Sequence, residues 1–421
     1  MFSLYQLINW VILPLAILRL LIKSRIEPKY RENLAERFGF AKPSKRSPVI
    51  WLHAVSVGEM LASEQLVKHL IDQFQEFNVL ITCTTPGGRE VALKINSDKI
   101  NVAYLPFDLT FFVSRFIKCY RPACLLVMET EIWPAIFTQC SKESIPIFAL
   151  NARLSDKSMH RYLRIKGLTK KTISCASAVL AQTKADAARL NRVGASKVIV
   201  SGNLKYDRRA TADQLELGQQ FRQLFGISRP IILAASTHEG EERPIIDDFL
   251  SGCPPQYLLV IVPRHSRRFS RVMQLMRTKD PYSGARSKNN PISEKCRLVL
   301  GDSMGEMYSY LTCSDIVIMG GSFASLGGQN PIEALSLGKQ VITGPSTHNF
   351  DEVVRQGSLA GVVHQVQNTK ETITVANALL LDEHVLGLKK KIAMGFTEKN
   401  AGALKKTMAY LISQRQSWRE H

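Results

Sequence analysis

The chain has 421 residues, 45% of them hydrophobic and 22% charged, a composition that excludes a mainly disordered protein and, at this length, favours two domains of about 150–200 residues. Its 55 Lys and Arg residues exceed its 36 Asp and Glu residues and give a formal net charge of +19. Such an excess favours a negatively charged partner: nucleic acid, anionic lipid or a phosphorylated substrate.

The first predicted element is the apolar segment 4–22, which five basic residues follow within the next fifteen positions. No basic region precedes the segment and no A-x-A site follows it, so we do not expect a cleaved signal peptide. Its length is marginal for crossing a bilayer, so it either spans the membrane or lies in the interface; a buried helix of a soluble domain is the alternative. The flanking charges predict a membrane anchor helix over 1–25, an anionic membrane surface as partner, and the remaining chain in the cytoplasm.

Short apolar runs recur from Pro48 onward, and each is followed by a polar turn and a helical pattern. Five precede residue 208: PVIWLHAV, NVLITCTT, ACLLVM, IPIFAL and SKVIVS. Five follow residue 228: RPIILAA, QYLLVIV, CRLVL, SDIVIM and KQVIT. Such alternation predicts an α/β fold with parallel sheets covered on both faces. Ligands of these sheets bind at the carboxyl ends of the strands, so we expect the polar turns to carry the chemistry.

The two sets of runs predict two Rossmann-like domains of five or six strands each. The polar helical stretch 208–228 lacks a strand signal, and we interpret it as a linker. The domains would then cover 26–207 and 229–421. We expect the last helix, which is basic and amphipathic, to pack back on the first domain.

Four charged residues in the first half are candidates for chemistry. Glu59 ends the motif S-x-x-E at 56–59, which is either a capping box or a carboxylate placed to take a proton from an attacking hydroxyl; the two are compatible. Glu129 and Glu131 are two residues apart, so they would project to one side of an extended chain. Lys205 in GNLKYD either pairs with one of these glutamates, neutralises an anionic ligand, or is simply exposed.

The second half has features of a nucleotide site. Arg264 directly follows QYLLVIVP, where a guanidinium can grip a phosphate. Glu306 follows Gly305 in a strand-to-helix turn and can accept hydrogen bonds from a base or ribose, and Glu333 can hold ribose hydroxyls. We expect a group of glycines to expose backbone N–H groups before the helix that begins at Pro331, which would form an anion site; a plain turn with a helix cap is the alternative. These glycines are Gly320, Gly321, Gly327 and Gly328.

Other common sites are not indicated. The glycines match neither a G-x-G-x-x-G fingerprint after the first strand nor a P-loop. No D-x-D and no C-x-x-C occur, so we expect neither a metal ion nor a cofactor. The basic residues are spread along the chain without interleaved aromatic residues, so we expect no nucleic acid partner.

Eight motifs, taken together, resemble the 3-deoxy-D-manno-octulosonic acid (Kdo) transferases of lipopolysaccharide biosynthesis. In chain order they are WLHAVSVGE, METEIWP, NARLSDKS, GNLKYD, ASTHEGEE, VPRH, GDSMGEM and GGSF…GG-x-NPIEA. The resemblance implies a GT-B fold, in which two Rossmann-like domains face a central cleft behind an N-terminal hydrophobic anchor helix. It also implies inverting transfer of Kdo from CMP-Kdo to a lipid A precursor, lipid IV(A), on the cytoplasmic face of a bacterial inner membrane.

The resemblance also implies roles for particular residues. Glu59 would be the general base, and Glu129 and Lys205 would stabilise the transition state. The residues that would bind CMP are Pro263, Arg264, Met304, Gly305, Glu306, Asn330, Pro331, Ile332 and Glu333. Gln329 departs from the family pattern, since many relatives have His there. The alternative function is that of another GT-B sugar-nucleotide enzyme with a UDP donor.

Overall fold

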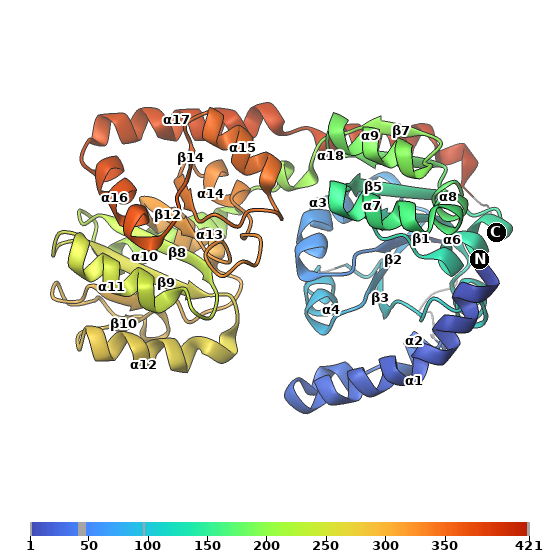
Figure 1. Ribbon diagram of the computed structural model, residues 1–421, viewed down its shortest axis with the longest axis horizontal. Coiled ribbons are helices and arrows are strands. Elements are labelled where there is room, and N and C mark those ends of the chain that lie inside the picture. The colour runs from blue at the N-terminus through green and yellow to red at the C-terminus, as the bar shows by residue number, and fades with distance from the viewer. Residues whose placement is uncertain (1, 41–47, 96, 419–421) are drawn as a thin grey trace. The chain divides into compact units, whose positions relative to one another are not determined.

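The computed structural model of the protein describes residues 2–40, 48–95 and 97–418, and it divides into two compact units (Figure 1). The first unit comprises the chain up to Asp207 together with the chain from Ala401 onward, and the second comprises Arg208–Asn400. The stretch interpreted as a linker, 208–228, thus lies within the second unit. Its helix buries Phe221 and Phe225, and the Phe221 ring centroid is 5.1 Å from that of Tyr310.

The first unit is built on a parallel sheet of seven strands in the order β3-β2-β1-β4-β5-β6-β7. The strands are β1 (Val49–His53), β2 (Asn78–Cys83), β3 (Ile100–Tyr104), β4 (Pro122–Met128), β5 (Ile147–Ala152), β6 (Ala178–Ala181) and β7 (Val198–Val200). β1, β2 and β4 are buried at every position. Alternate residues of β1 enter two different cores, Trp51 one and Leu52 the other, as a sheet covered on both faces requires.

Helices accompany this sheet. They are α1 (Phe2–Ile26), η1 (Pro28–Arg31), α2 (Leu34–Arg37), α3 (Val57–Gln73), α4 (Pro86–Leu93), α5 (Thr110–Tyr120), α6 (Pro134–Lys142), α7 (Asp156–Arg164), α8 (Lys166–Ile173), α9 (Lys184–Val193), η2 (Leu204–Asp207), α18 (Ala403–Ser413) and η5 (Arg415–Ser417). The last long helix, α18, packs in this unit: its Met408 and Leu411 share a core with Leu52 of β1.

The second unit repeats the architecture, with strand order β10-β11-β9-β8-β12-β13-β14 and all pairings parallel. The strands are β8 (Ile231–Thr237), β9 (Leu258–Pro263), β10 (Gly284–Ala285), β11 (Leu298–Leu300), β12 (Ile316–Met319), β13 (Gln340–Thr343) and β14 (Val363–Gln365). The helices are α10 (Ala212–Phe225), α11 (Glu242–Gly252), η3 (Ser266–Arg268), α12 (Phe269–Lys279), η4 (Arg286–Lys288), α13 (Met307–Cys313), α14 (Ile332–Ser336), α15 (Asp351–Leu359), α16 (Thr369–Leu380) and α17 (Glu383–Asn400).

Each sheet contains one point where the strand order reverses. In the first unit β1 pairs with both β2 and β4, and in the second β8 pairs with both β9 and β12. The connections on the two sides of such a point run in opposite directions, which leaves a crevice at the carboxyl ends of the two strands. The loops after β1 and β4, and those after β8 and β12, are therefore the places where each unit can receive a ligand.

Helix α1 is long and apolar enough to cross a membrane by length and composition, with a mean hydropathy of 1.8 over its most apolar window. Figure 1 shows it as a dark blue helix that extends away from the sheet of its own unit. Its first turns contact that unit: the Tyr5 hydroxyl donates to Asp108 Oδ2 at 2.7 Å, and the Trp10 ring centroid is 5.5 Å from that of Phe112. The remainder exposes a row of aliphatic side chains.

Candidate active site

Glu59 lies at the carboxyl end of β1, in the first turn of α3. Ser56 is the N-cap of that helix: its Oγ accepts a hydrogen bond from Glu59 N at 3.3 Å and donates one to Glu59 Oε1 at 2.9 Å. Val55 N donates to Glu59 Oε2 at 2.8 Å. Ser56 thus caps the helix through Glu59 N, and the bonds from Val55 N and Ser56 Oγ hold the Glu59 carboxylate at the switch point of the sheet.

Glu129 and Lys205 form an ion pair beside Glu59. Lys205 Nζ donates to Glu129 Oε1 at 2.9 Å, and both side chains are mostly buried. Glu129 follows β4 with a φ of 55°, so the chain has already left the extended conformation. The prediction that Glu129 and Glu131 project together from an extended chain is therefore wrong. The charge of Glu129 nevertheless acts on Glu59, and the charge of Glu59 acts on Glu131.

The position of Lys205 is fixed from two sides. Asn151 Oδ1 accepts a hydrogen bond from Leu204 N at 3.0 Å, which ties η2 to the end of β5. Asp207 Oδ1 and Oδ2 accept from Gly402 N and Leu404 N at 2.6 and 2.8 Å, so this carboxylate caps α18. Lys205 is thereby held at the edge of the sheet where Glu59 and Glu129 also lie.

The electrostatics of this cluster suit proton transfer near neutral pH. Burial and the charge of Glu129 raise the pKa of Glu59 to about 7, while its hydrogen bonds and the Lys205 ammonium oppose the rise. Burial and the charge of Glu59 raise the pKa of Glu131 to about 7 as well. A carboxyl group with a pKa near the working pH is present in part as the base and returns the proton readily.

In the second unit, Pro263 ends β9, and the other predicted CMP-binding residues follow β9, β11 and β12 at the carboxyl edge of the sheet. Both carboxylates among these residues, Glu306 and Glu333, already pair with arginines. Arg286 Nε and Nη2 donate to Glu306 Oε2 and Oε1 at 3.2 and 3.1 Å, and Arg208 forms an ion pair with Glu333. Each carboxylate has further lone pairs that can accept from a hydroxyl, so both can still bind a ribose.

The glycine-rich turn after β12 differs from expectation. Its four glycines were expected to expose backbone N–H groups, but each N–H is donated inside the protein. Gly320 N donates to Ala235 O at 2.9 Å and Gly328 N to Gly321 O at 3.0 Å; Gly321 N donates to Glu241 Oε2 at 2.8 Å and Gly327 N to Ser346 Oγ at 3.0 Å. The prediction that these glycines form an open anion cradle is wrong, because acceptors inside the second unit, most of them outside the loop, already take these N–H groups.

Sequence reasoning missed three residues of these sites. Arg286 lies in a polar loop with no distinguishing pattern, yet its guanidinium stacks 4.5 Å from the Phe221 ring centroid while it binds Glu306. Glu241 lies in the motif ASTHEGEE, but nothing in that motif says which N–H groups it meets. Glu131 was noted beside Glu129 without a role.

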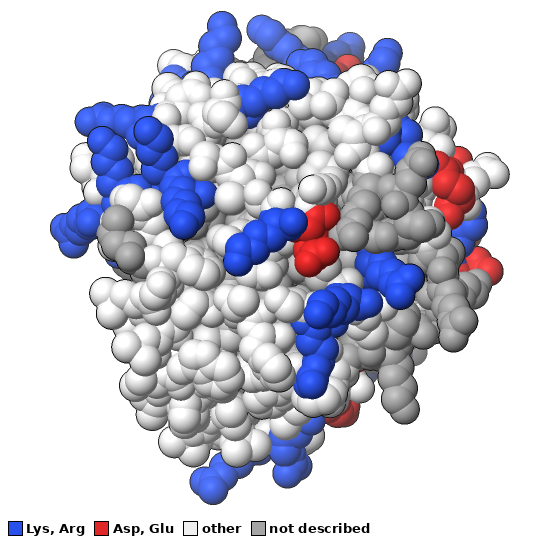
Figure 2. Space-filling model, turned by 90° about the vertical axis from the view of Figure 1, so that its right-hand side faces the viewer, with Lys and Arg blue, Asp and Glu red and all other residues white. Residues whose placement is uncertain are grey.

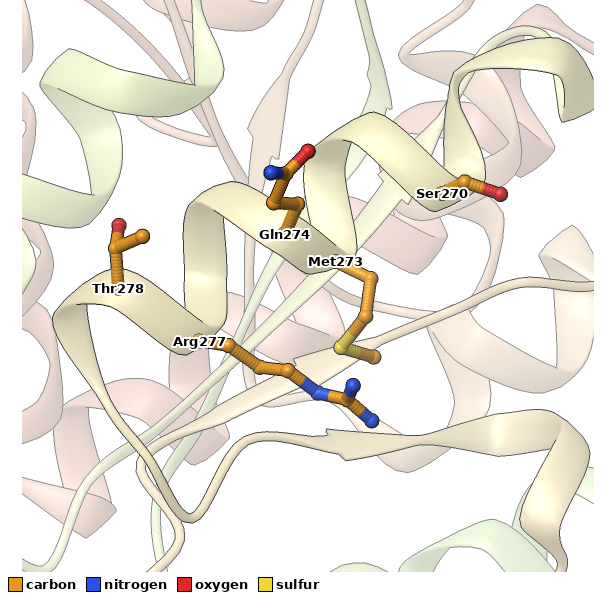
Figure 3. A pocket seen from close by; sticks show the side chains of 5 residues that line it. All are labelled: Ser270, Met273, Gln274, Arg277 and Thr278. Atoms are coloured by element: carbon orange, nitrogen blue, oxygen red, sulfur yellow. The ribbon is translucent and has the colours of Figure 1, made fainter.

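One cavity of about 480 Å³ lies elsewhere, along α12 (Figure 3). Its lining residues are Ser270, Met273, Gln274, Arg277 and Thr278. All five project from one helix, whereas the predicted residues lie in the loops at the carboxyl ends of the strands. We therefore assign it no part in the candidate site.

Two Rossmann-like units with charged loops at their switch points define a protein of the GT-B class. A family model described as 3-Deoxy-D-manno-octulosonic-acid transferase (kdotransferase) matches residues 32–208. The 3-deoxy-D-manno-octulosonic acid transferase of Haemophilus influenzae is 37% identical over 358 residues, which cover 84% of this chain and 82% of that protein. That of Bordetella pertussis is 32% identical over 383 residues, covering 88% and 89%.

The chain therefore belongs to the 3-deoxy-D-manno-octulosonic acid transferase family and is a glycosyltransferase. The solved UDP-GlcNAc 2-epimerase from Neisseria meningitidis bound to UDP-GlcNAc matches the fold with a TM-score of 0.59 at 18% identity, covering 87% of this chain and 100% of that one. The family resemblance and the GT-B fold expected from the sequence are confirmed.

Proposed function

We propose that the protein transfers Kdo from CMP-Kdo onto lipid IV(A), with Glu59 as the general base. The observation that carries this proposal is the buried Glu59 carboxylate, which Val55 N and Ser56 Oγ hold at the switch point of the first sheet in a chain of the Kdo transferase family. Burial raises its pKa to about 7. A single-displacement sugar transfer needs a base for the attacking hydroxyl, and a buried carboxylate with this pKa supplies one at neutral pH.

The proposed reaction balances without a co-reactant. A hydroxyl of the acceptor gives its proton to Glu59 as its oxygen bonds to the anomeric carbon of Kdo. The bond from that carbon to the phosphate oxygen breaks, and CMP leaves with the electron pair. Lys205, held by Glu129, presents a fixed positive charge to the negative charge that develops, which is the preorganised stabilisation that dominates many such reactions. We expect the reaction to need no metal ion and therefore to proceed in EDTA.

CMP would be held by the residues after β9, β11 and β12: Pro263 with Arg264, Met304 to Glu306, and Asn330 to Glu333. The Arg264 guanidinium has no carboxylate within ion-pair distance among the residues that the structure describes, so it can take the phosphate. Met304 is 56% exposed and Gly305 has open space at its Cα. A nucleotide can therefore reach this loop without displacing packed side chains.

Arg286→Ala should weaken CMP binding by about tenfold, because Glu306 would lose its bidentate partner and its fixed position. Calorimetric titration with CMP measures the change. Lys288→Ala, an exposed position in the same short helix, is the control and should bind like the wild type. Equal affinity in all three proteins would show that the Glu306 loop does not hold the nucleotide.

We propose that α1 lies in the membrane interface of the bacterial inner membrane, with both units on the cytoplasmic side. Tyr5 and Trp10 contact the rest of the first unit, so these turns of α1 stay at its surface. This favours a helix that lies in the membrane interface rather than one that spans the bilayer. Lys and Arg side chains are spread over the face drawn in Figure 2, where Asp and Glu are sparse, and an anionic membrane attracts such a surface.

Val11→Asp with Leu15→Asp should abolish most binding to vesicles that contain anionic lipid. These side chains are 68% and 64% exposed, so the change removes apolar contacts with lipid and leaves the protein core intact. Vesicle flotation measures the binding, and thermal unfolding checks the fold. Leu359→Asp, at an exposed position of the second unit, is the matched control. If the double variant floats like the wild type, α1 is not the anchor.

Incubation of the purified chain with CMP-Kdo and lipid IV(A), followed by mass spectrometry of the lipid, tests the function as a whole. We expect the mass of the lipid to increase by that of one or more Kdo residues. Parallel reactions with UDP-GlcNAc test the alternative donor. If product forms with the UDP sugar and not with CMP-Kdo, the proposal is wrong and the protein is an enzyme with a UDP donor.

A further inference from the structure

Glu241 joins two loops across the switch point of the second sheet. It follows β8 and is only 2% exposed. Its Oε2 accepts hydrogen bonds from His238 N and Gly321 N, each at 2.8 Å. Its Oε1 accepts from Phe323 N at 2.9 Å and Ala324 N at 3.2 Å. Three of these four donors belong to the loop after β12, so one carboxylate satisfies three N–H groups of that loop.

The neighbouring carboxylate is used differently. Glu242 is also buried, but it accepts from Arg268 Nη2 at 2.9 Å and from Thr237 Oγ1 at 2.8 Å. Its charge is therefore balanced by a guanidinium, as is usual for a buried carboxylate. The four bonds to Glu241 come from peptide N–H groups, which is the set of partners that a bound anion finds in a backbone nest. The carboxylate of Glu241 thus takes the position that a bound anion would have in such a nest.

The loop that Glu241 binds has a conformation that needs external support. Ser325 has a φ of 54°, and Gly321, Gly327 and Gly328 have φ values between 72° and 85°. A positive φ is unfavourable for a serine and persists only where surrounding contacts impose it. A Cβ at Gly320 would lie 2.4 Å from Ser236 O, so the start of the loop presses against the end of β8. The loop residues that donate to Glu241 come directly after Gly320 in the chain.

We propose that Glu241 is a positioning residue, which takes the place of an anion to hold the loop 320–329 in the shape that binds the sugar-nucleotide donor. The part that concerns the donor rests on the proposed function. The loop carries Gln329, whose Nε2 lies 3.2 Å from His238 Nε2, and leads into Asn330. Because Glu241 binds both His238 N and the start of the loop, it sets the position of His238 relative to Gln329 at the edge of the proposed donor site.

The test compares Glu241→Ala, Glu241→Gln and Glu239→Ala in the full chain. Glu239 lies in the same turn, but its side chain is 66% exposed and paired with Arg271, so its variant controls for local charge. Hydrogen–deuterium exchange measures the amides of 320–329, and calorimetry measures CMP binding. Both measurements are repeated in sodium formate and, as a control, in sodium chloride at equal ionic strength.

Glu241→Ala should exchange faster in 320–329 and bind CMP at least about tenfold more weakly, because three loop N–H groups lose their acceptor. Formate, a carboxylate small enough for the vacated site, should reverse part of both changes, and chloride should not. Glu241→Gln fills the site, turns an amide NH₂ toward N–H donors, and should not be rescued. Glu239→Ala should behave like the wild type.

Two results would overturn the proposal: unchanged exchange in 320–329 of both Glu241 variants, or faster exchange in Glu241→Ala that formate does not reduce. The second would mean that an anion at this position does not hold the loop. Faster exchange with unaltered CMP affinity would overturn the link to the donor. If the wild type itself does not bind CMP, the proposed donor fails, while the exchange data still decide whether Glu241 holds the loop.

Discussion

Glu59→Gln is expected to lower the rate of Kdo transfer at saturating substrates by about 10³-fold, within the range for loss of a general base. The amide keeps an oxygen that can accept from Val55 N, so α3 retains part of its cap, but it cannot take a proton. Binding of CMP should change little, because the predicted nucleotide residues belong to the second unit. The measurement is the turnover number, with calorimetry for CMP.

The same variant has a predicted effect on stability. The folded protein holds the pKa of Glu59 above its ordinary value, so it binds this proton more tightly than the unfolded chain does. The resulting stabilisation is fully present below the unfolded pKa of about 4.3 and is lost as the pH rises through about 7. Between pH 5 and pH 8, the free energy of unfolding should therefore fall less for Glu59→Gln than for the wild type.

A matched control for Glu59→Gln is Glu64→Gln on the same helix. Glu64 pairs with Lys68 at 2.9 Å on a more exposed part of the helix, and its substitution should leave turnover within about twofold of the wild type, since surface ion pairs contribute little. If Glu59→Gln retained wild-type turnover, another group would have to be the base. Glu131, whose pKa is also about 7, would be the first candidate.

Lys205→Met is expected to lower turnover by about 10²-fold and to shift the pH dependence of transfer upward. The methionine preserves much of the aliphatic chain but removes the charge that stabilises the transition state. Lys205 also lowers the pKa of Glu59, so without it the carboxyl group should lose its proton at higher pH. Leaving Glu129 without this partner should cost roughly 2 kcal/mol of stability, less than a fully buried pair would.

Lys68→Met removes the other member of the Glu64 pair and is the control for Lys205→Met. It should alter neither the turnover number nor the pH profile. A Lys205→Met profile that coincides with the wild-type profile, despite a loss of rate, would mean that the lysine does not act on Glu59. The loss of rate would then come from the missing charge at the transition state alone.

Much of the fold was predictable because it depends on local patterns. The long apolar strands are buried on both faces, so they appear in the sequence as continuous runs. Four strands were not expected from the sequence. β3 and β14 are partly exposed, β10 has only two residues, and β6 is buried but has only four residues. Short strands of this kind gain their structure from neighbouring strands rather than from their own sequence.

The candidate site was predictable only in part. Strand ends and polar turns identified Glu59, Glu129 and Lys205, because parallel strands bring their carboxyl ends to one edge. Hydrogen-bond partners could not be predicted in the same way. The glycines after β12 have the composition of an anion site, yet Glu241 fills it from a turn 80 residues earlier in the chain. Arg286 likewise reaches Glu306 through tertiary packing that its own loop does not encode.

The most direct test of Glu59 as the general base is the pH dependence of the turnover number for Kdo transfer between pH 5 and pH 9. If Glu59 is the base, the rate of the wild type rises tenfold per pH unit at low pH and levels off above about 7, and the residual rate of Glu59→Gln lacks this rise. A wild-type rate that is flat across the range, or a rise that Glu59→Gln retains, would contradict the assignment.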